Sequence, residues 1–178
     1  MGRLLLTLTD RQYSLLKSHL LPPKRRLEEA AFVFTLPVIR QGDLSFRFLD
    51  WFPIEPDAFL HRSSAHLELR DEIRPRVIKR AHDLGASLVE FHSHLSSRPP
   101  QFSPSDIAGF EEFVPHVRWR LNGRPYLAIV MASGGFDALV WVSSSDYPEA
   151  LHCLIAGHQV MVPTGLTIQH LETKINDR

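Results

Sequence analysis

Residues 90–106, EFHSHLSSRPPQFSPSD, hold two histidines one residue apart, then a proline-rich bend, then Ser103 and Asp106. The apolar residues just before them predict a buried strand that ends at the histidines, and SPSD predicts the first turn of a helix. Side chains alternate between the two faces of a strand, so His92 and His94 are expected on the same side. There they lie close enough to share one ion.

The same stretch admits two interpretations. Ser103-Pro104-Ser105-Asp106 is typical of a helix N-terminus, with Ser as N-cap, Pro at the first position and an acid at the third. Taken alone, this pattern favours a capping box, and a lone His-x-His is more often incidental than metal-binding. Together within 15 residues, the two patterns favour a metal site, because a cap needs no histidines upstream and capping does not stop Asp106 from ligating. Two imidazoles and a carboxylate leave the fourth position of tetrahedral zinc open, as in hydrolytic sites.

Composition limits the classes of protein that fit. The 178 residues, 44% of them hydrophobic, are enough for one domain spanning residues 1–178 with a sizeable core. The 20 basic residues are matched by 20 acidic ones, which argues against nucleic acid as a partner. The single cysteine, Cys153, excludes an internal disulfide and is expected to be a buried small hydrophobe. No signal peptide or membrane span is predicted, so we expect a soluble, cytoplasmic protein.

Strands and helices alternate along the chain, but hairpins also occur, which predicts an α/β fold with a mixed sheet. Strands are predicted at 3–8, 30–40, 44–54, 66–70, 86–94, 125–132 and 136–143, and helices at 9–20, 71–85 and 103–121. Acidic residues are expected in the first turn of the second helix, and Gly85 at its end. Pro115 could kink or end the third helix. The run at 151–162 is apolar. His61, His66, His82, His152 and His158 have no ligand partner at a convincing spacing, and we assign them to the surface or to packing.

The pattern around the histidines resembles the signature of the JAMM (JAB/MPN+) metalloproteases: a distant glutamate, His-x-His, a spacer and Ser-x-x-Asp. Here the spacer between His94 and Ser103 is eight residues long, one more than is usual, and Leu95 stands where the family often has proline. The resemblance implies that His92, His94 and Asp106 hold one Zn²⁺ per chain. It also implies that the Ser103 hydroxyl helps to stabilise an oxyanion.

The glutamate of this signature lies at the start of a long buried strand in the family. The segment LEEAAFVFTL (27–36) supplies it, and Glu28 fits the Glu-x-x-small-hydrophobic context. Shifting the frame by one residue gives Glu29; we favour Glu28 and keep Glu29 as the alternative. The resemblance implies that this acid takes a proton from the attacking water and delivers it to the leaving amine.

The resemblance covers most of the chain and implies the cytidine-deaminase-like JAB/MPN fold, with a mixed β-sheet flanked by helices. It implies a zinc isopeptidase or peptidase that cleaves after the C-terminal tail of a ubiquitin-like protein. The compact chain looks like the stand-alone JAMM proteins of bacteria, some of which are encoded with ubiquitin-like conjugation enzymes in antiviral operons. The alternatives are a non-catalytic scaffold of the same fold and a peptidase that releases a C-terminal amino acid from a sulfur-carrier protein. A barrel-type metallohydrolase would need a longer chain.

Overall fold

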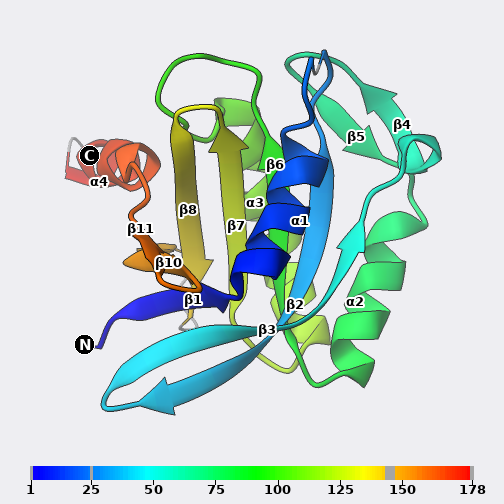
Figure 1. Ribbon diagram of the computed structural model, residues 1–178. Helices are drawn as coiled ribbons and strands as arrows, with labels where there is room; N and C mark the ends of the chain where they lie inside the picture. Colours follow the sequence, from blue (N-terminus) through cyan, green and yellow to red (C-terminus); the bar gives the residue numbers. More distant parts are fainter. Residues whose placement is uncertain (1, 25, 143–146, 177–178) are drawn as a thin grey trace.

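A large mixed β-sheet flanked by helices dominates the protein. The computed structural model describes residues 2–24, 26–142 and 147–176 (Figure 1). Nine strands form the sheet, in the order β11-β10-β1-β3-β2-β6-β7-β8-β9. Their bounds are β1 Leu4–Leu8, β2 Ala30–Arg40, β3 Asp43–Pro53, β6 Ser87–Ser93, β7 Tyr126–Ala132, β8 Gly135–Trp141, β9 Glu149–Ala150, β10 Cys153–Ala156 and β11 Gln159–Met161. The α/β class with a mixed sheet is therefore confirmed.

The middle of the sheet mixes parallel and antiparallel pairs. β2 and β3 form a long antiparallel hairpin whose turn contains Gln41 and Gly42, both with positive φ. β6 runs antiparallel to β2 and parallel to β7, and β7 runs antiparallel to β8. Every residue of β6 and of β7 is buried, as expected for strands covered on both faces. The candidate ligand His92 therefore lies on a central strand, and His94 directly follows that strand.

Helices cover both faces of this sheet, so there are two apolar clusters. α1 (Asp10–Leu20) lies over one face, where Leu16 and Leu20 join a cluster that includes Phe91. α2 (Ile73–Asp83) and α3 (Pro104–Arg120) lie over the other face, with Val77 and Val114 in a cluster that includes Phe32. α4 (Leu166–Asn176) packs against the same side through Ile168 and Leu171. His92 lies on the face that α2 and α3 cover.

Local sequence signals account for most helix boundaries. Thr9 caps α1 in a capping box with Gln12, and Gly85, with φ of 63°, follows the end of α2. The acidic residues expected in the first turn of α2 precede the helix instead, because it begins at Ile73 after Glu72. Pro115 does not end α3, which continues to Arg120.

The strand predicted at 66–70 is observed as β5, but several short elements were not predicted. A 3-10 turn (Pro56–Ala58) leads into β4 (Phe59–Arg62), which pairs with β5 (Leu67–Leu69) in a separate two-stranded sheet. The apolar run at 151–162 divides into β10 and β11, and α4 follows it. The predicted strand 136–143 ends at Trp141, and residue 143 lies outside the described residues. Among the described residues, no helix combines the length and the apolar character needed to cross a membrane.

Candidate metal centre

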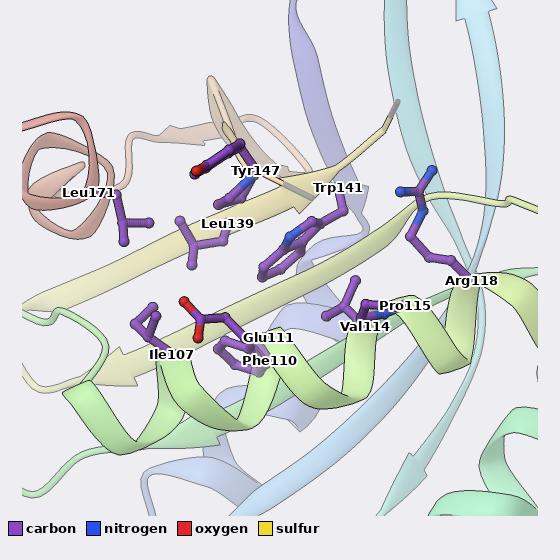
Figure 2. Close-up of a pocket in the computed structure, with 11 residues that line it drawn as sticks. Ile107, Phe110, Glu111, Val114, Pro115, Arg118, Leu139, Trp141, Tyr147 and Leu171 are labelled. Carbon is purple, nitrogen blue, oxygen red and sulfur yellow. The ribbon is translucent and has the colours of Figure 1, made fainter. Parts of the chain in front are cut away.

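Two of the concave regions that α3 borders differ sharply in chemistry. A groove of about 550 Å³ lies between α3 and β8 (Figure 2). Its walls are mainly apolar, with Phe110, Leu139, Trp141 and Leu171 facing the space and Glu111 and Arg118 as its ionisable groups. No histidine lines it, so among the described residues it offers no metal-ligand set. The second region is a smaller pocket, which is lined by histidines and carboxylates.

The smaller pocket, of about 200 Å³, brings together the candidate ligands, Ser103 and the favoured one of the two candidate bases. It lies at the end of β6, where the first turn of α3 and the segment before β2 meet. Its lining includes Glu28, His92, His94, Ser103 and Asp106. These residues come from three separate segments of the chain, so their convergence is a property of the fold and not of local sequence.

The two histidines reach the pocket because of strand geometry. His92 lies within β6, and His94 follows directly after the strand's last residue, Ser93. The His94 amide donates to the carbonyl of Met131 at 2.8 Å, which extends the pairing with β7 past the strand end. His92 is 4% exposed. The His94 side chain is more accessible, at 19%, so solvent reaches the site more readily at His94 than at His92.

Asp106 reaches the pocket as part of a helix cap. Ser103 is the N-cap of α3; its hydroxyl accepts from the Asp106 amide at 3.2 Å, and its own amide donates to Asp106 Oδ2 at 2.8 Å. The expected capping box is therefore confirmed. The same carboxylate oxygen faces both histidines. Capping fixes the Asp106 side chain where it can also act as a ligand, so the two interpretations of SPSD are compatible.

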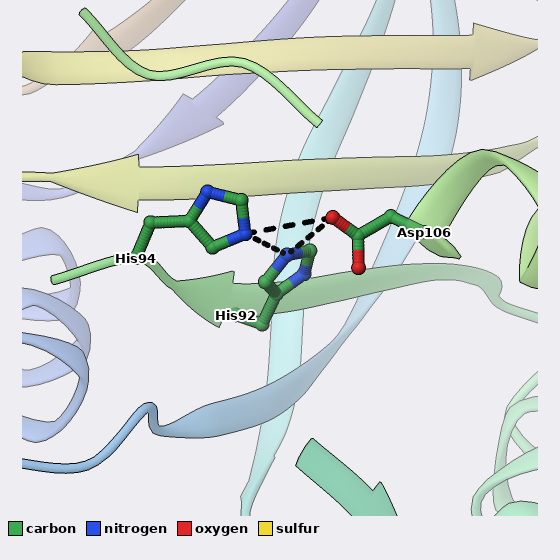
Figure 3. Close-up of side chains that lie close together, drawn as sticks. All are labelled: His92, His94 and Asp106. Atoms are coloured by element: carbon green, nitrogen blue, oxygen red, sulfur yellow. Dashed lines mark hydrogen bonds and ion pairs between the residues drawn. The ribbon is translucent and has the colours of Figure 1, made fainter. Parts of the chain in front are cut away.

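The distances among the three side chains fit a tetrahedral metal ion. His92 Nε2 and His94 Nε2 are 3.2 Å apart, and Asp106 Oδ2 lies 3.6 Å from the first and 3.5 Å from the second (Figure 3). Tetrahedral zinc with bonds of about 2.0–2.1 Å separates its ligand atoms by about 3.3–3.4 Å. Three candidate ligand atoms thus form a triangle of the right size for one ion. The group His92, His94 and Asp106 can hold a metal ion.

The electrostatics of the group couple the acid to the histidines. Burial opposes ionisation of Asp106, but hydrogen bonds from His92, His94 and Ser103 outweigh it and hold the pKa of the carboxyl well below its usual range. Burial disfavours the charged form of His92, yet the hydrogen bond and charge of Asp106 raise its pKa above the ordinary value. Asp106 is therefore an anion and a ready ligand, and His92 must release its proton before a cation binds.

Strand register distinguishes Glu28 from Glu29. In the antiparallel pairing of β2 and β6, Ala30 lies opposite His92. Extending that register by two residues places Glu28 opposite His94, on the same face, whereas Glu29 belongs to the other face. The Glu28 side chain lines the pocket and is buried, and burial raises the pKa of its carboxyl above the ordinary value. Of the two acids, Glu28 alone lines the pocket with the candidate ligands.

The Ser103 hydroxyl lies at the pocket but makes local contacts. It donates to Asp106 Oδ2 at 2.7 Å and lies 2.8 Å from the Ser105 hydroxyl. A hydroxyl carries one donatable proton, so a hydrogen bond from Ser103 to a substrate oxygen would replace the bond to Asp106. The structure thus places Ser103 beside the candidate ligands as a cap.

Sequence reasoning missed an ionic group beside the histidines. Glu90 lies on β6 two residues before His92, and so on the same face. Its carboxylate accepts from the Tyr126 hydroxyl at 2.6 Å and from Arg74 at 3.2 Å. Arg74 also lies over the ring of Phe113, at 4.0 Å. The buried carboxylate is therefore satisfied by two donors. The signal available in the sequence was an acid inside an otherwise apolar strand.

His66 was assigned to the surface, and it is exposed, but it also lines the pocket. It lies in the connection between β4 and β5, next to Ala65 and Leu67, which also border the pocket. No spacing rule relates His66 to the other site residues, because only the folded β4–β5 hairpin brings it there.

Comparisons with known proteins do not name a family. No family model matches the sequence, and no curated protein matches it. Among solved structures, the chain is similar to the solution structure of protein DSY2949 from Desulfitobacterium hafniense, with 18% sequence identity and a TM-score of 0.44. The alignment covers 86% of this chain and 94% of that one.

Proposed function

We propose that this chain is a zinc-dependent isopeptidase or peptidase of the JAMM type, with the cytidine-deaminase-like JAB/MPN fold. The observation that carries the proposal is the convergence of His92, His94 and Asp106 at tetrahedral ligand spacing. Glu28, from a segment more than 60 residues earlier in the chain, lines the same pocket. A capped helix explains neither the histidine pair nor a buried acid at this position.

The chemistry follows from the groups present. A zinc ion held by the three side chains would supply Lewis acidity, activating water and polarising a carbonyl. Glu28 would accept the proton of the attacking water and return it to the leaving amine. Burial raises the pKa of Glu28, which brings the base closer to neutral pH, where such proton transfers are most efficient. Both carboxyl groups act as anions: the raised pKa of Glu28 suits a base that accepts a proton, and the lowered pKa of Asp106 suits a ligand.

The substrate class rests on the resemblance to JAMM proteases, supported by the shape of the site. Ala65 and His66, between β4 and β5, and Leu67, the first residue of β5, line the pocket. Within the described residues, each strand of this two-stranded sheet has one edge without a strand partner. An extended tail could add to such an edge by main-chain hydrogen bonds. We propose the C-terminal tail of a ubiquitin-like protein as the occupant and the bond after it as the one cleaved.

Two measurements test this function. Elemental mass spectrometry of the purified protein should find close to one zinc per chain. The zinc-loaded protein should then cleave ubiquitin-like proteins of bacterial origin that carry a C-terminal peptide extension, and the Glu28→Gln variant should not. A protein that takes up no zinc on titration would be a scaffold. If the zinc-loaded unmodified protein cleaves no substrate that the Glu28→Gln variant leaves intact, the assignment as a protease is refuted.

A further inference from the structure

The loop that carries the candidate ligand Asp106 is tied to the N-terminus of α4. The Phe102 amide donates to Thr167 Oγ1 at 3.0 Å, and the Thr164 hydroxyl donates to the carbonyl of Pro100 at 2.7 Å. Thr167 is 4% exposed. Two hydrogen bonds therefore connect the stretch just before Ser103 with a segment more than 60 residues later in the chain.

A buried carboxylate on β8 anchors this connection. Asp137 is fully buried, and its Oδ1 accepts from the amides of Ala138 and Gly165, each at 3.0 Å. Its Oδ2 accepts from the Thr167 amide at 3.0 Å and from the Thr167 hydroxyl at 2.6 Å. Asp137 thus satisfies amides that the first turn of α4 leaves without an intrahelical acceptor. A buried carboxylate with four donors is held in one position.

The carboxylate also sets the direction of the Thr167 hydroxyl. The Thr167 hydroxyl donates to Asp137 Oδ2, and a hydroxyl has only one proton to donate. The lone pairs of the hydroxyl then face the Phe102 N–H. The result is a directed chain of hydrogen bonds from Phe102 through Thr167 to Asp137, in which each bond strengthens the next.

This chain ends beside the metal centre. The ring of Phe102 packs against that of His92 with centroids 5.7 Å apart. The next residue, Ser103, caps α3 and binds Asp106 through its amide and hydroxyl. His92, Val130 and Asp137 also lie in one row across β6, β7 and β8, which puts Asp137 about 10 Å from His92 on the same face. The anchor and the site therefore share a rigid part of the sheet.

We propose that Thr167 is a positioning residue for the metal centre, holding Phe102 so that Ser103 and Asp106 stay at ligand distance from the histidines. Asp137 acts through Thr167 and makes α4 part of the support of the site. The inference rests on the proposed zinc site. It assigns a function to a helix whose described side chains do not line the pocket.

The test measures zinc affinity in variants that differ by one atom group. Thr167→Val keeps the shape but removes the hydroxyl, and Thr167→Ser restores it. The control is Thr35→Val, the same change at a fully buried threonine on β2. The Thr35 hydroxyl donates to the carbonyl of Ser87, the first residue of β6, at 3.5 Å. Supporting groups around metal ligands typically change affinity by about 10–100-fold. We expect about tenfold weaker zinc binding in Thr167→Val, measured by competition with a chromophoric chelator, and affinity within about twofold of the unmodified protein in the other two.

The absorption spectrum of bound Co²⁺ adds a readout that reduced stability alone does not change. We expect an altered spectrum in Thr167→Val and an unaltered one in Thr167→Ser and Thr35→Val. Equal zinc affinity and equal spectra in Thr167→Val and the unmodified protein would overturn the positioning role and leave the proposed function intact. If the unmodified protein takes up neither metal, both proposals fail.

A measurement on the unmodified protein covers the case in which Thr167→Val does not fold. The coupling between the Phe102–Thr167 hydrogen bond and zinc binding is reciprocal. If the hydrogen bond raises the zinc affinity by a given factor, bound zinc raises the equilibrium constant for forming the hydrogen bond by the same factor. Hydrogen exchange of the Phe102 amide should therefore slow by about tenfold on zinc loading. The Gly157 amide, bonded to Leu8 at 3.0 Å, serves as the reference. An unchanged rate at Phe102 would overturn the proposal.

Discussion

Glu29 and Arg62 form an ion pair at 2.6 Å, with both side chains largely buried. Arg62 thus occupies the carboxylate of Glu29, the neighbour of Glu28, and the ion pair joins the segment before β2 to β4. The amide and carbonyl of Glu29 also bond to Ser93, at the end of β6. Glu29 is thereby a structural residue, and Glu28 is the acid that lines the pocket. The two neighbours should respond differently to the same substitution.

Glu28→Gln is expected to abolish most of the activity without loss of zinc. A positioned general base contributes about 10²–10⁴-fold to a rate, so kcat should fall by that factor. Glutamine keeps the size of the side chain and removes only its basicity. The measurement is the single-turnover rate of the zinc-loaded protein on a cleaved substrate, together with zinc content. Glu29→Gln is the matched control and should keep kcat within a few fold while lowering thermal stability. A reversal, with Glu29→Gln inactive, would assign the base to Glu29.

Ser103→Ala separates capping from catalysis. Loss of an N-cap hydroxyl typically costs about 0.5–2 kcal/mol in the free energy of unfolding. If the Ser103 hydroxyl also stabilises an oxyanion, kcat should fall further, by about 10²–10³-fold. Thr9→Ala is the control, because Thr9 caps α1 in the same kind of box far from the pocket. Urea denaturation should show similar losses in both variants, and kcat should fall only in Ser103→Ala. Equal kcat in the two would limit Ser103 to capping.

Zinc is expected to bind more weakly below the pKa of His92, which lies above the ordinary histidine value. In the metal-free protein Asp106 raises the pKa of His92 above 6.5, so the protonated form is favoured by folding. The stability it contributes is fully present below the unfolded pKa and is lost as pH rises through the folded one. Zinc competes with this proton. Below the pKa of His92, the Kd should therefore rise about tenfold per pH unit, in titrations from about pH 5.5 to about pH 8.

Nuclear magnetic resonance of the metal-free protein checks the cause of that pH dependence. The His92 ring protons should titrate above the ordinary value, and Asp106→Asn should lower the pKa because it removes the charge that favours the protonated ring. A His92 pKa that is the same in Asp106→Asn would show that the carboxylate is not responsible.

The sequence predicts most of this fold because its strands are long and apolar and its caps are local. The runs 30–40 and 86–94 coincide with β2 and β6 within one residue at each end, and the capping box at Ser103 needs only neighbouring residues. The candidate ligands are predictable for the same reason, since all three lie within a strand, a bend and a helix start. Local patterns are sufficient to name these residues, whereas the fold brings them into one pocket.

Other features depend on contacts between distant segments. The choice between Glu28 and Glu29 follows from the pairing of Ala30 with His92. This register cannot be predicted from the sequence of either strand alone. The amides at the N-terminus of α4 donate to Asp137, almost 30 residues earlier in the chain. The helix start therefore could not be predicted from a local capping residue. The strand predicted at 66–70 is β5, but its partner β4 has four residues, which is too short for a clear periodic pattern.

Tyr126→Phe is expected to destabilise the protein while leaving the metal centre in place. The hydroxyl of Tyr126 donates at 2.6 Å to the buried carboxylate of Glu90, which keeps Arg74 as its second donor. Removing one donor from a buried charged acceptor costs about 1–3 kcal/mol, measurable by urea denaturation of the metal-free protein. Zinc affinity should change by less than about threefold, because Arg74 still holds Glu90 on the same face as His92. Tyr13→Phe, on the half-buried face of α1, is the control and should leave stability within about 0.5 kcal/mol. A Tyr126→Phe protein of full stability but impaired zinc binding would instead make the Tyr126–Glu90 pair part of the site's own machinery.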